Sequence, residues 1–172
     1  FAVVRYGNVM GSRGSVIPHF ISLADQSALP ITHPNMTRFM ISLDQGVELV
    51  WRAFDEMVGG EIFVKKIPSM RVTDIAAAIA PNAGHDIVGI RPGEKLHEQM
   101  IGFEDSPYTY EYDDYFKILP SFDFINQDTS RIKEGTKVPD GFIYSSDNNS
   151  EWMSVDELKK WVDLNKDLME KI

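Results

Sequence analysis

The chain has 172 residues, enough for a domain with its own hydrophobic core, and 43% of them are hydrophobic. It contains no cysteine, which excludes disulfides, thiol catalysis and thiolate metal sites. The net charge of −9 argues against nucleic-acid binding through overall charge. There is no apolar run of membrane-spanning length and no recognisable signal peptide, so we expect a cytoplasmic protein.

The first eighteen residues organise the chain. Ala2–Tyr6 is predicted to be a strand because of its β-branched and aromatic content and the glycine that follows it. A loop with Gly11 and Gly14 comes next, and Ser15 is the expected cap of a helix that reaches Gln26. A strand that passes through a glycine-bearing loop into a helix is where open α/β sheets bind their ligands.

The next segment combines a loop with a long helix. A short strand is expected over Leu29–Thr32 and a loop over His33–Phe39. Ser42 and Gln45 fit a capping box at the start of the helix. Helical spacing predicts that its buried stripe consists of Val47, Val50, Trp51 and Phe54. Further on, the pattern predicts strands at Glu61–Lys65 and Asp86–Ile90 and a helix capped by Thr73 between them.

The second half of the chain is less regular. Tyr110–Leu119 is expected to be extended and partly edge-like, Thr129–Gly141 a loop, and Phe142–Tyr144 a short strand. Ser154 and Glu157 form a second capping box, for a final helix. The apolar face of that helix is predicted to hold Leu158, Trp161, Val162 and Leu168. Alternating strands and helices indicate the α/β class, and the looser second half indicates a small α+β lobe.

Three arginines stand in loops beside predicted strands or helices: Arg13 in GSRGSV, Arg38 in MTRF and Arg91 in RPGEK. Arginine suits bidentate recognition of phosphate, and the free N–H groups of helix N-termini also attract anions. If the three side chains converge, they form a site for an anionic ligand such as a nucleotide. Each of them taken alone is more often a surface charge or a loop brace.

Two further polar residues have open interpretations. Asn8, at a strand end, could read a base or sugar edge or merely cap a turn. Glu94 could hydrogen-bond a ribose hydroxyl or pair with Arg91 or Lys95. The histidines lack metal-ligand spacing and no serine has a nucleophile-elbow context, so neither a metal site nor serine hydrolysis is predicted. The local chemistry contains no complete catalytic constellation.

Four longer motifs point to a known family. In chain order they are RYGNVMGSRGSVIP, MTRFMISLDQGVELV, GGEIFVKKIPSM and IRPGEKLHEQMI. They resemble the C-terminal half of the inverting UDP-N-acetylglucosamine 4,6-dehydratases, which are extended short-chain dehydrogenase/reductase proteins of pseudaminic-acid and capsule pathways. The likeness runs from Phe1 to about Ile118 and resumes over Phe142–Trp152.

This resemblance implies a Rossmann domain for NADP and a smaller substrate lobe. The last Rossmann elements would lie in residues 1–70 and most of the substrate lobe in residues 71–172. The implied reaction takes hydride from sugar C4, eliminates water across C5 and C6, and returns hydride to C6 with inversion at C5. The implied product is a 4-keto-6-deoxy hexose, and the cofactor starts and ends each turnover oxidised.

The resemblance also assigns roles to residues. Val9 would contact the cofactor beside the nicotinamide, and Asn8 would contact the substrate. Arg38 and Arg91 would bind the UDP moiety, with Glu94 on its ribose. The residues that would wrap the UDP-sugar are Arg13, Gly14, Ser15, Val16 and Ile17.

The family's glycine-rich dinucleotide loop, Tyr-x-x-x-Lys pair and acid/base residues would precede Phe1, so no catalytic residue is assigned. We therefore expect a fragment that is inactive alone, binds NADP poorly and self-associates through exposed apolar faces near Ala2–Tyr6, whereas the whole enzyme is expected to be a homo-oligomer. One alternative is a stand-alone module that binds a nucleotide sugar or a partner without turnover. Another is a related nucleotide-sugar epimerase or retaining dehydratase.

Overall fold

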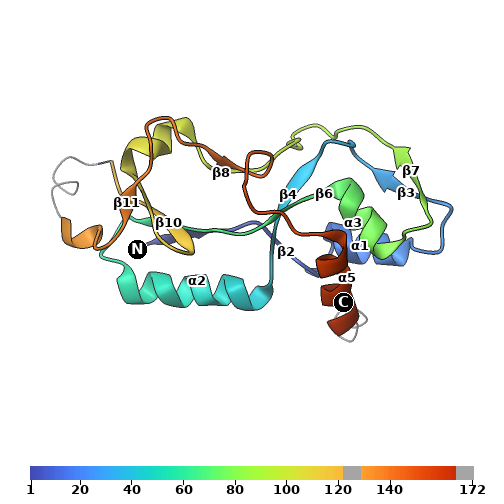
Figure 1. Cartoon of the computed structure of the whole chain (residues 1–172), viewed down its shortest axis with the longest axis horizontal. Helices are drawn as coiled ribbons and strands as arrows, with labels where there is room; N and C mark the ends of the chain where they lie inside the picture. Colours follow the sequence, from blue (N-terminus) through green and yellow to red (C-terminus); the bar gives the residue numbers. More distant parts are fainter. Residues whose placement is uncertain (122–128, 166–172) are drawn as a thin grey trace. The chain divides into compact units, whose positions relative to one another are not determined.

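The structure is a computed structural model that describes residues 1–121 and 129–165 (Figure 1). These residues form two compact units that interleave along the chain. Unit 1 comprises Phe1–Tyr6, Ser42–Ile67 and Gln99–Ser145; unit 2 comprises Gly7–Ile41, Pro68–Glu98 and the described residues from Ser146 onward. Within each unit, strand pairing joins segments distant in sequence. The expected division at residue 70, between the last Rossmann elements and the substrate lobe, stays a prediction.

Unit 1 is built on a mixed sheet with helix α2 (Leu43–Glu56) alongside it (Figure 1). The strands follow the order β1 (Val3–Arg5), β5 (Ile62–Lys65), β10 (Tyr115–Ile118), β9 (Thr109–Glu111) and β11 (Thr136–Lys137). β1 and β5 are parallel, and the other pairs are antiparallel. The unit also contains the pair β8 (Gln99–Ile101) and β12 (Tyr144–Ser145) and the 3-10 helices η1 (Phe103–Tyr108) and η2 (Thr129–Arg131).

Unit 2 contains two small sheets and three helices. One sheet has the order β2 (Asn8–Val9), β4 (Thr37–Ile41), β6 (Ser69–Arg71), and the other is the parallel pair β3 (Ala28–Ile31) and β7 (Gly84–Ile87). The helices are α1 (Val16–Ser22), α3 (Val72–Ile79) and α5 (Val155–Leu164), and α3 contacts both others (Figure 1). Their apolar faces meet in a core that includes Phe20, Met70, Ile75 and Leu158.

Much of the predicted pattern is confirmed. The strand expected at Ala2–Tyr6 is β1, and the one at Glu61–Lys65 is β5. Both capping boxes form, with Ser42 and Gln45 at α2 and with Ser154 and Glu157 at α5. In the final helix Leu158 is buried and Trp161 and Val162 pack against the core, whereas Leu168 lies outside the described residues.

The buried stripe predicted for α2 is wrong. The residues that face the core are Gly46, Leu49 and Ala53, while Trp51 is 64% exposed and Phe54 is 61% exposed. Val47 is also exposed and Val50 is half-buried. Apolar residues occupy two faces of this helix, and spacing alone does not say which face meets the sheet.

Other boundaries shift for identifiable reasons. Thr37–Phe39, expected in a loop, begins β4, whose antiparallel partner β6 lies some thirty residues later and is invisible to local pattern. Helix α1 ends at Ser22 rather than at Gln26. The backbone N–H groups of Leu23, Ala24 and Gln26 donate to carbonyls three residues earlier, whereas an α-helix requires bonds to carbonyls four residues earlier.

Three more expectations need correction. β10, expected near an edge, pairs with β5 and β9 on either side and is buried along its length. Within Thr129–Gly141, expected to be loop, η2 and β11 form. Helix α3 is capped at Arg71 rather than at Thr73.

Candidate functional site

Asn8 is placed by a close approach between two strands of unit 2. β2 pairs in parallel with β4, with Asn8 opposite Met40. Just before it, a Cβ added at Gly7 would lie 2.4 Å from the Cβ of Phe39, so a side chain at this position would push the strands apart. The glycine thereby lets Asn8 lie against β4.

The following loop turns back onto α1 through two glycines with positive φ, Gly11 at 72° and Gly14 at 73°. Backbone hydrogen bonds close its turns, from Ser12 N to Val9 O and from Ser15 N to Ser12 O. Ser15 occupies the N-cap of α1, but its side chain makes no capping hydrogen bond. Within the described part of the chain its Oγ is buried and has no hydrogen-bond partner.

A pocket of about 590 Å³ opens in unit 2. It lies at the carboxyl ends of the parallel strands β3 and β7, since Thr32 and Val88 directly follow them and line it. Its predicted lining residues are Asn8, Arg13, Gly14, Ser15, Val16, Arg38, Arg91 and Glu94; the others are Pro18, His19, Phe20, Pro30, Thr32, Met36, Val72 and Val88.

The three arginines therefore meet at one pocket, but they are held differently. The Arg38 side chain is 12% exposed and donates to the carbonyls of Thr37 at 2.8 Å and Leu96 at 3.2 Å. In residues 1–121 and 129–165, no hydrogen bond or ion pair engages the guanidinium of Arg13 or Arg91. Three arginines face one carboxylate, Glu94, in the lining, so the pocket is locally positive in an acidic chain.

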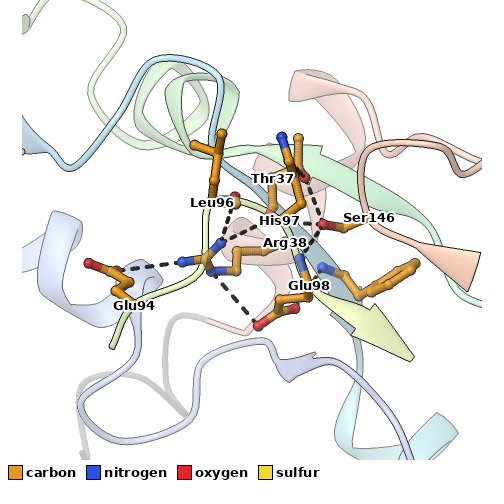
Figure 2. A network of polar contacts seen from close by, with 8 residues as sticks. Thr37, Arg38, Glu94, Leu96, His97, Glu98 and Ser146 are labelled. Atoms are coloured by element: carbon orange, nitrogen blue, oxygen red, sulfur yellow. Dashed lines mark hydrogen bonds and ion pairs between the residues drawn. The ribbon is translucent and has the colours of Figure 1, made fainter. Parts of the chain in front are cut away.

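Figure 2 shows how Arg38 is surrounded. Its NH2 lies 3.5 Å from Glu94 Oε1, and its Nε lies 3.8 Å from Glu98 Oε1. Glu94 also accepts from the backbone N–H of Arg91 at 3.3 Å. Glu94 thus pairs with Arg38, rather than with Arg91 or Lys95, the partners that its position in sequence suggested.

Next to Arg38, hydroxyl groups link β4 to the segment 96–98 (Figure 2). Thr37 Oγ1 lies 2.8 Å from His97 Nδ1 and 2.6 Å from Ser146 Oγ. Ser146 is fully buried, its Oγ accepts from the backbone N–H of Glu98, and its own N–H donates to the Glu98 carbonyl. These bonds fix the backbone from which the Glu98 side chain extends.

The carboxylate of Glu98 meets donors from two strands. It accepts from the backbone N–H of Phe39 at 3.3 Å. Asn8 Nδ2 donates to its Oε2 at 2.9 Å and to its Oε1 at 3.2 Å, in the amide orientation that satisfies hydrogen bonding. Burial raises the pKa of Glu98, against the opposing effects of the Phe39 N–H and the charges of Arg38 and Lys95.

Two predicted site residues do not reach the pocket. Ile17 is 1% exposed and packs in the core of unit 2, because its position on α1 faces inward. Val9 lies in β2, half-buried, and does not line the pocket. Sequence reasoning missed Thr32 and Val88, which it placed inside predicted strands, and it missed Glu98, whose partner Asn8 is ninety residues away.

Comparison with known proteins shows the family of this α/β chain. A family model described as polysaccharide biosynthesis protein matches residues 1–120, so the chain belongs to that family. It is 54% identical over 165 residues to UDP-N-acetylglucosamine 4,6-dehydratase (inverting) of Campylobacter jejuni, which confirms the resemblance seen in the motifs. That match covers 92% of this chain and 49% of the relative, so the chain spans about half the length of that curated relative.

The chain also matches an epimerase sequence and a crystal structure. The chain is 43% identical over 121 residues to UDP-glucose 4-epimerase of Rickettsia canadensis, covering 67% of this chain and 36% of the relative. The crystal structure of Pen from Bacillus thuringiensis matches with a TM-score of 0.79 and 31% identity, over 98% of this chain and 50% of that one. The mixed α/β fold expected for the C-terminal part of an extended short-chain dehydrogenase/reductase is thereby confirmed. In the described residues no helix is long and apolar enough to cross a membrane.

Proposed function

We propose that this chain forms the substrate-binding part of an inverting UDP-N-acetylglucosamine 4,6-dehydratase that serves polysaccharide biosynthesis. The observation that carries the proposal is the convergence of Arg13, Arg38 and Arg91 on one pocket. Identity of 54% to the Campylobacter dehydratase supports the choice of reaction. The volume of about 590 Å³ falls within the usual range for small-molecule sites.

A pyrophosphate matches the charge and the hydrogen-bonding capacity of this pocket. Its oxygens only accept, and guanidinium groups only donate, in a geometry that permits paired hydrogen bonds. Arg13 and Arg91 offer guanidinium groups that the described residues leave unengaged. Arg38, held by backbone carbonyls and Glu94, would contribute a fixed charge at lower cost in side-chain entropy.

The buried hydroxyl of Ser15 points to the same conclusion. A buried polar atom without a partner costs free energy and needs an explanation. Ser15 lines the pocket, so a ligand oxygen there would supply the missing hydrogen bond. Gly14 and Val16 would flank the ligand, Asn8 would contact it, and Glu94 would hold its ribose. Ile17 would support this wall from the core.

NADP is the cofactor that we infer for the whole enzyme, where it would supply hydride transfer. This chain does not by itself fit that role. Its sequence contains no G-x-G-x-x-G dinucleotide-binding loop. The proposed contribution of this chain is therefore to bind and orient the nucleotide sugar.

The test is calorimetric titration of UDP into the protein at its natural length, comparing wild type with Arg91→Ala. Loss of a charged bidentate contact is expected to cost roughly 1.5–3 kcal/mol, or about a tenfold to hundredfold loss of affinity. Lys95→Ala is the matched control, since it removes the same charge from the same loop outside the pocket. Equal affinity in wild type and Arg91→Ala would contradict the proposal.

A nucleotide-sugar 4-epimerase is the second candidate, favoured by the 43% identity to the Rickettsia epimerase. Product analysis by NMR separates the two, since only the inverting dehydratase loses the C6 hydroxyl and inverts C5. A module without turnover is distinguished by the gene: an in-frame glycine-rich loop encoded upstream of Phe1 supports the enzyme, and a local start codon supports the module.

A further inference from the structure

The amide of Asn8 can take only one orientation in its surroundings. Its nitrogen lies within hydrogen-bond distance of three acceptors, namely both carboxylate oxygens of Glu98 and the carbonyl of Phe39 at 3.3 Å. A carboxylate and a carbonyl offer no proton to the amide oxygen. Asn8 Oδ1 is therefore turned away from them, and across the described residues it accepts no hydrogen bond. Asn8 itself lines the pocket.

We propose that Glu98 is a positioning residue that makes Asn8 present its carbonyl oxygen, rather than its amide nitrogen, to the ligand. This inference rests on the proposed function, and it assigns Asn8 to a particular part of the substrate. An amide oxygen accepts hydrogen bonds and repels the oxygens of a pyrophosphate. It suits a hydroxyl or an acetamido N–H of the sugar. The sugar would therefore lie at Asn8 and the phosphates at the arginines.

Glu98 is well held for this role. Its backbone N–H donates to the hydroxyl of the buried Ser146, and its carbonyl accepts from the backbone N–H of the same residue. Its carboxylate accepts from the backbone N–H of Phe39 in β4. β4 is also the strand that pairs with Asn8, so the two side chains extend from elements of fixed register. Glutamine at position 98 would keep the shape but could offer either an oxygen or an N–H, so the Asn8 amide would be free to flip.

Arg38 offers a competing route, because its Nε lies 3.8 Å from Glu98 Oε1. Through this contact a change at Glu98 could weaken phosphate binding instead of sugar binding. The two routes predict different ligands to be affected. An effect through Asn8 changes the affinity for the nucleotide sugar alone, whereas an effect through Arg38 changes the affinity for UDP as well.

The experiment titrates UDP and UDP-N-acetylglucosamine separately into the protein at its natural length. Four forms are compared: wild type, Glu98→Gln, Asn8→Ala and the double variant. Glu98→Gln is expected to lower affinity for the sugar nucleotide roughly three- to tenfold and to leave UDP binding unchanged. In the Asn8→Ala background, Glu98→Gln should have no further effect. Glu98→Asp, which keeps an acceptor-only group, should retain more affinity than Glu98→Gln.

Thermal unfolding shows that the variants fold. The inference is overturned if Glu98→Gln weakens UDP equally or still acts when Asn8 is alanine. If wild type binds no UDP, the proposed function falls as well; if UDP binds and depends on Arg91, only the inference about Glu98 is at stake.

Discussion

Ser15 shows how a single side chain can separate stability from binding. Its hydroxyl is buried without a hydrogen bond from the described residues, and it does not cap α1. Ser15→Ala should therefore leave the melting temperature unchanged or slightly higher, because it removes an unsatisfied polar group. The same change should weaken the binding of a UDP-sugar roughly three- to tenfold, as measured by calorimetry.

Ser12→Ala is the matched control, since Ser12 lies in the same loop, is exposed and does not line the pocket. It should change neither property. A Ser15→Ala protein that loses stability and keeps its affinity would show that the hydroxyl serves the fold.

At the residue scale, unit 1 holds an ion pair between a buried lysine and a partly buried glutamate. Lys117 is 1% exposed, and its Nζ donates to Glu56 Oε2 at 2.9 Å. The Tyr115 hydroxyl donates to the same oxygen at 2.7 Å. Burial alone would raise the pKa of Glu56, but the bonds from Lys117 and Tyr115 outweigh burial and lower it below 4.5. Burial and the charge of Glu56 raise the pKa of Tyr112 to about 12, so this phenol stays neutral.

A depressed carboxyl pKa contributes stability above the unfolded-state value and loses it as pH falls through the folded-state value. Chemical denaturation should therefore show a free energy of unfolding that decreases from about pH 6 to below pH 4. Glu56→Gln should flatten part of that decrease. At neutral pH it should cost about 3 kcal/mol, because it leaves the Lys117 ammonium buried without its carboxylate.

Lys117→Met in the Glu56→Gln background should recover much of that loss, since it removes the uncompensated charge. A pH dependence that is identical in wild type and Glu56→Gln would show that other carboxylates control acid unfolding.

At the element scale, α2 presents apolar side chains on the side away from its sheet. Leu43, Val47, Trp51 and Phe54 follow one another at helical spacing and are all exposed, with the rings of Trp51 and Phe54 6.0 Å apart. Strand β1 also has one partner strand, β5, among the described residues. An exposed apolar stripe and an open strand edge each favour association.

We therefore expect the chain of 172 residues to self-associate, and the pair Trp51→Glu and Phe54→Glu to reduce its mass in light scattering without loss of stability. Leu49→Ala, on the buried face, should instead destabilise unit 1 by about 2–5 kcal/mol. A wild-type chain that scatters as a monomer at high concentration would refute the expectation.

The elements also show what the sequence could predict. Capping boxes, glycine turns and short apolar strands depend on neighbouring residues, and so the starts of α2 and α5 were predictable. The inward face of α2 and the strand at Thr37 depend on partners that only the fold supplies. The candidate site was likewise only partly predictable. Arg13 and Arg91 stand in loops that the sequence identifies, whereas the contact of Glu98 with Asn8 exists only after folding.

At the scale of the whole molecule, the family and the α/β class were predictable from long motifs, and the division into units was not. Pairing of β1 with β5 and of β5 with β10 gathers segments from across the sequence into unit 1. The chain passes between the units at residues 6–7, 41–42, 67–68, 98–99 and 145–146.

Those repeated passages constrain how the protein is made. As the chain leaves the ribosome, unit 1 lacks its last segment until Ser145 has emerged, and unit 2 is completed later still. Unit 1 can therefore close only after Ser145 has emerged, and unit 2 only after that. Such late closure leaves unfinished sheet and core exposed to solvent during synthesis, a condition that favours aggregation.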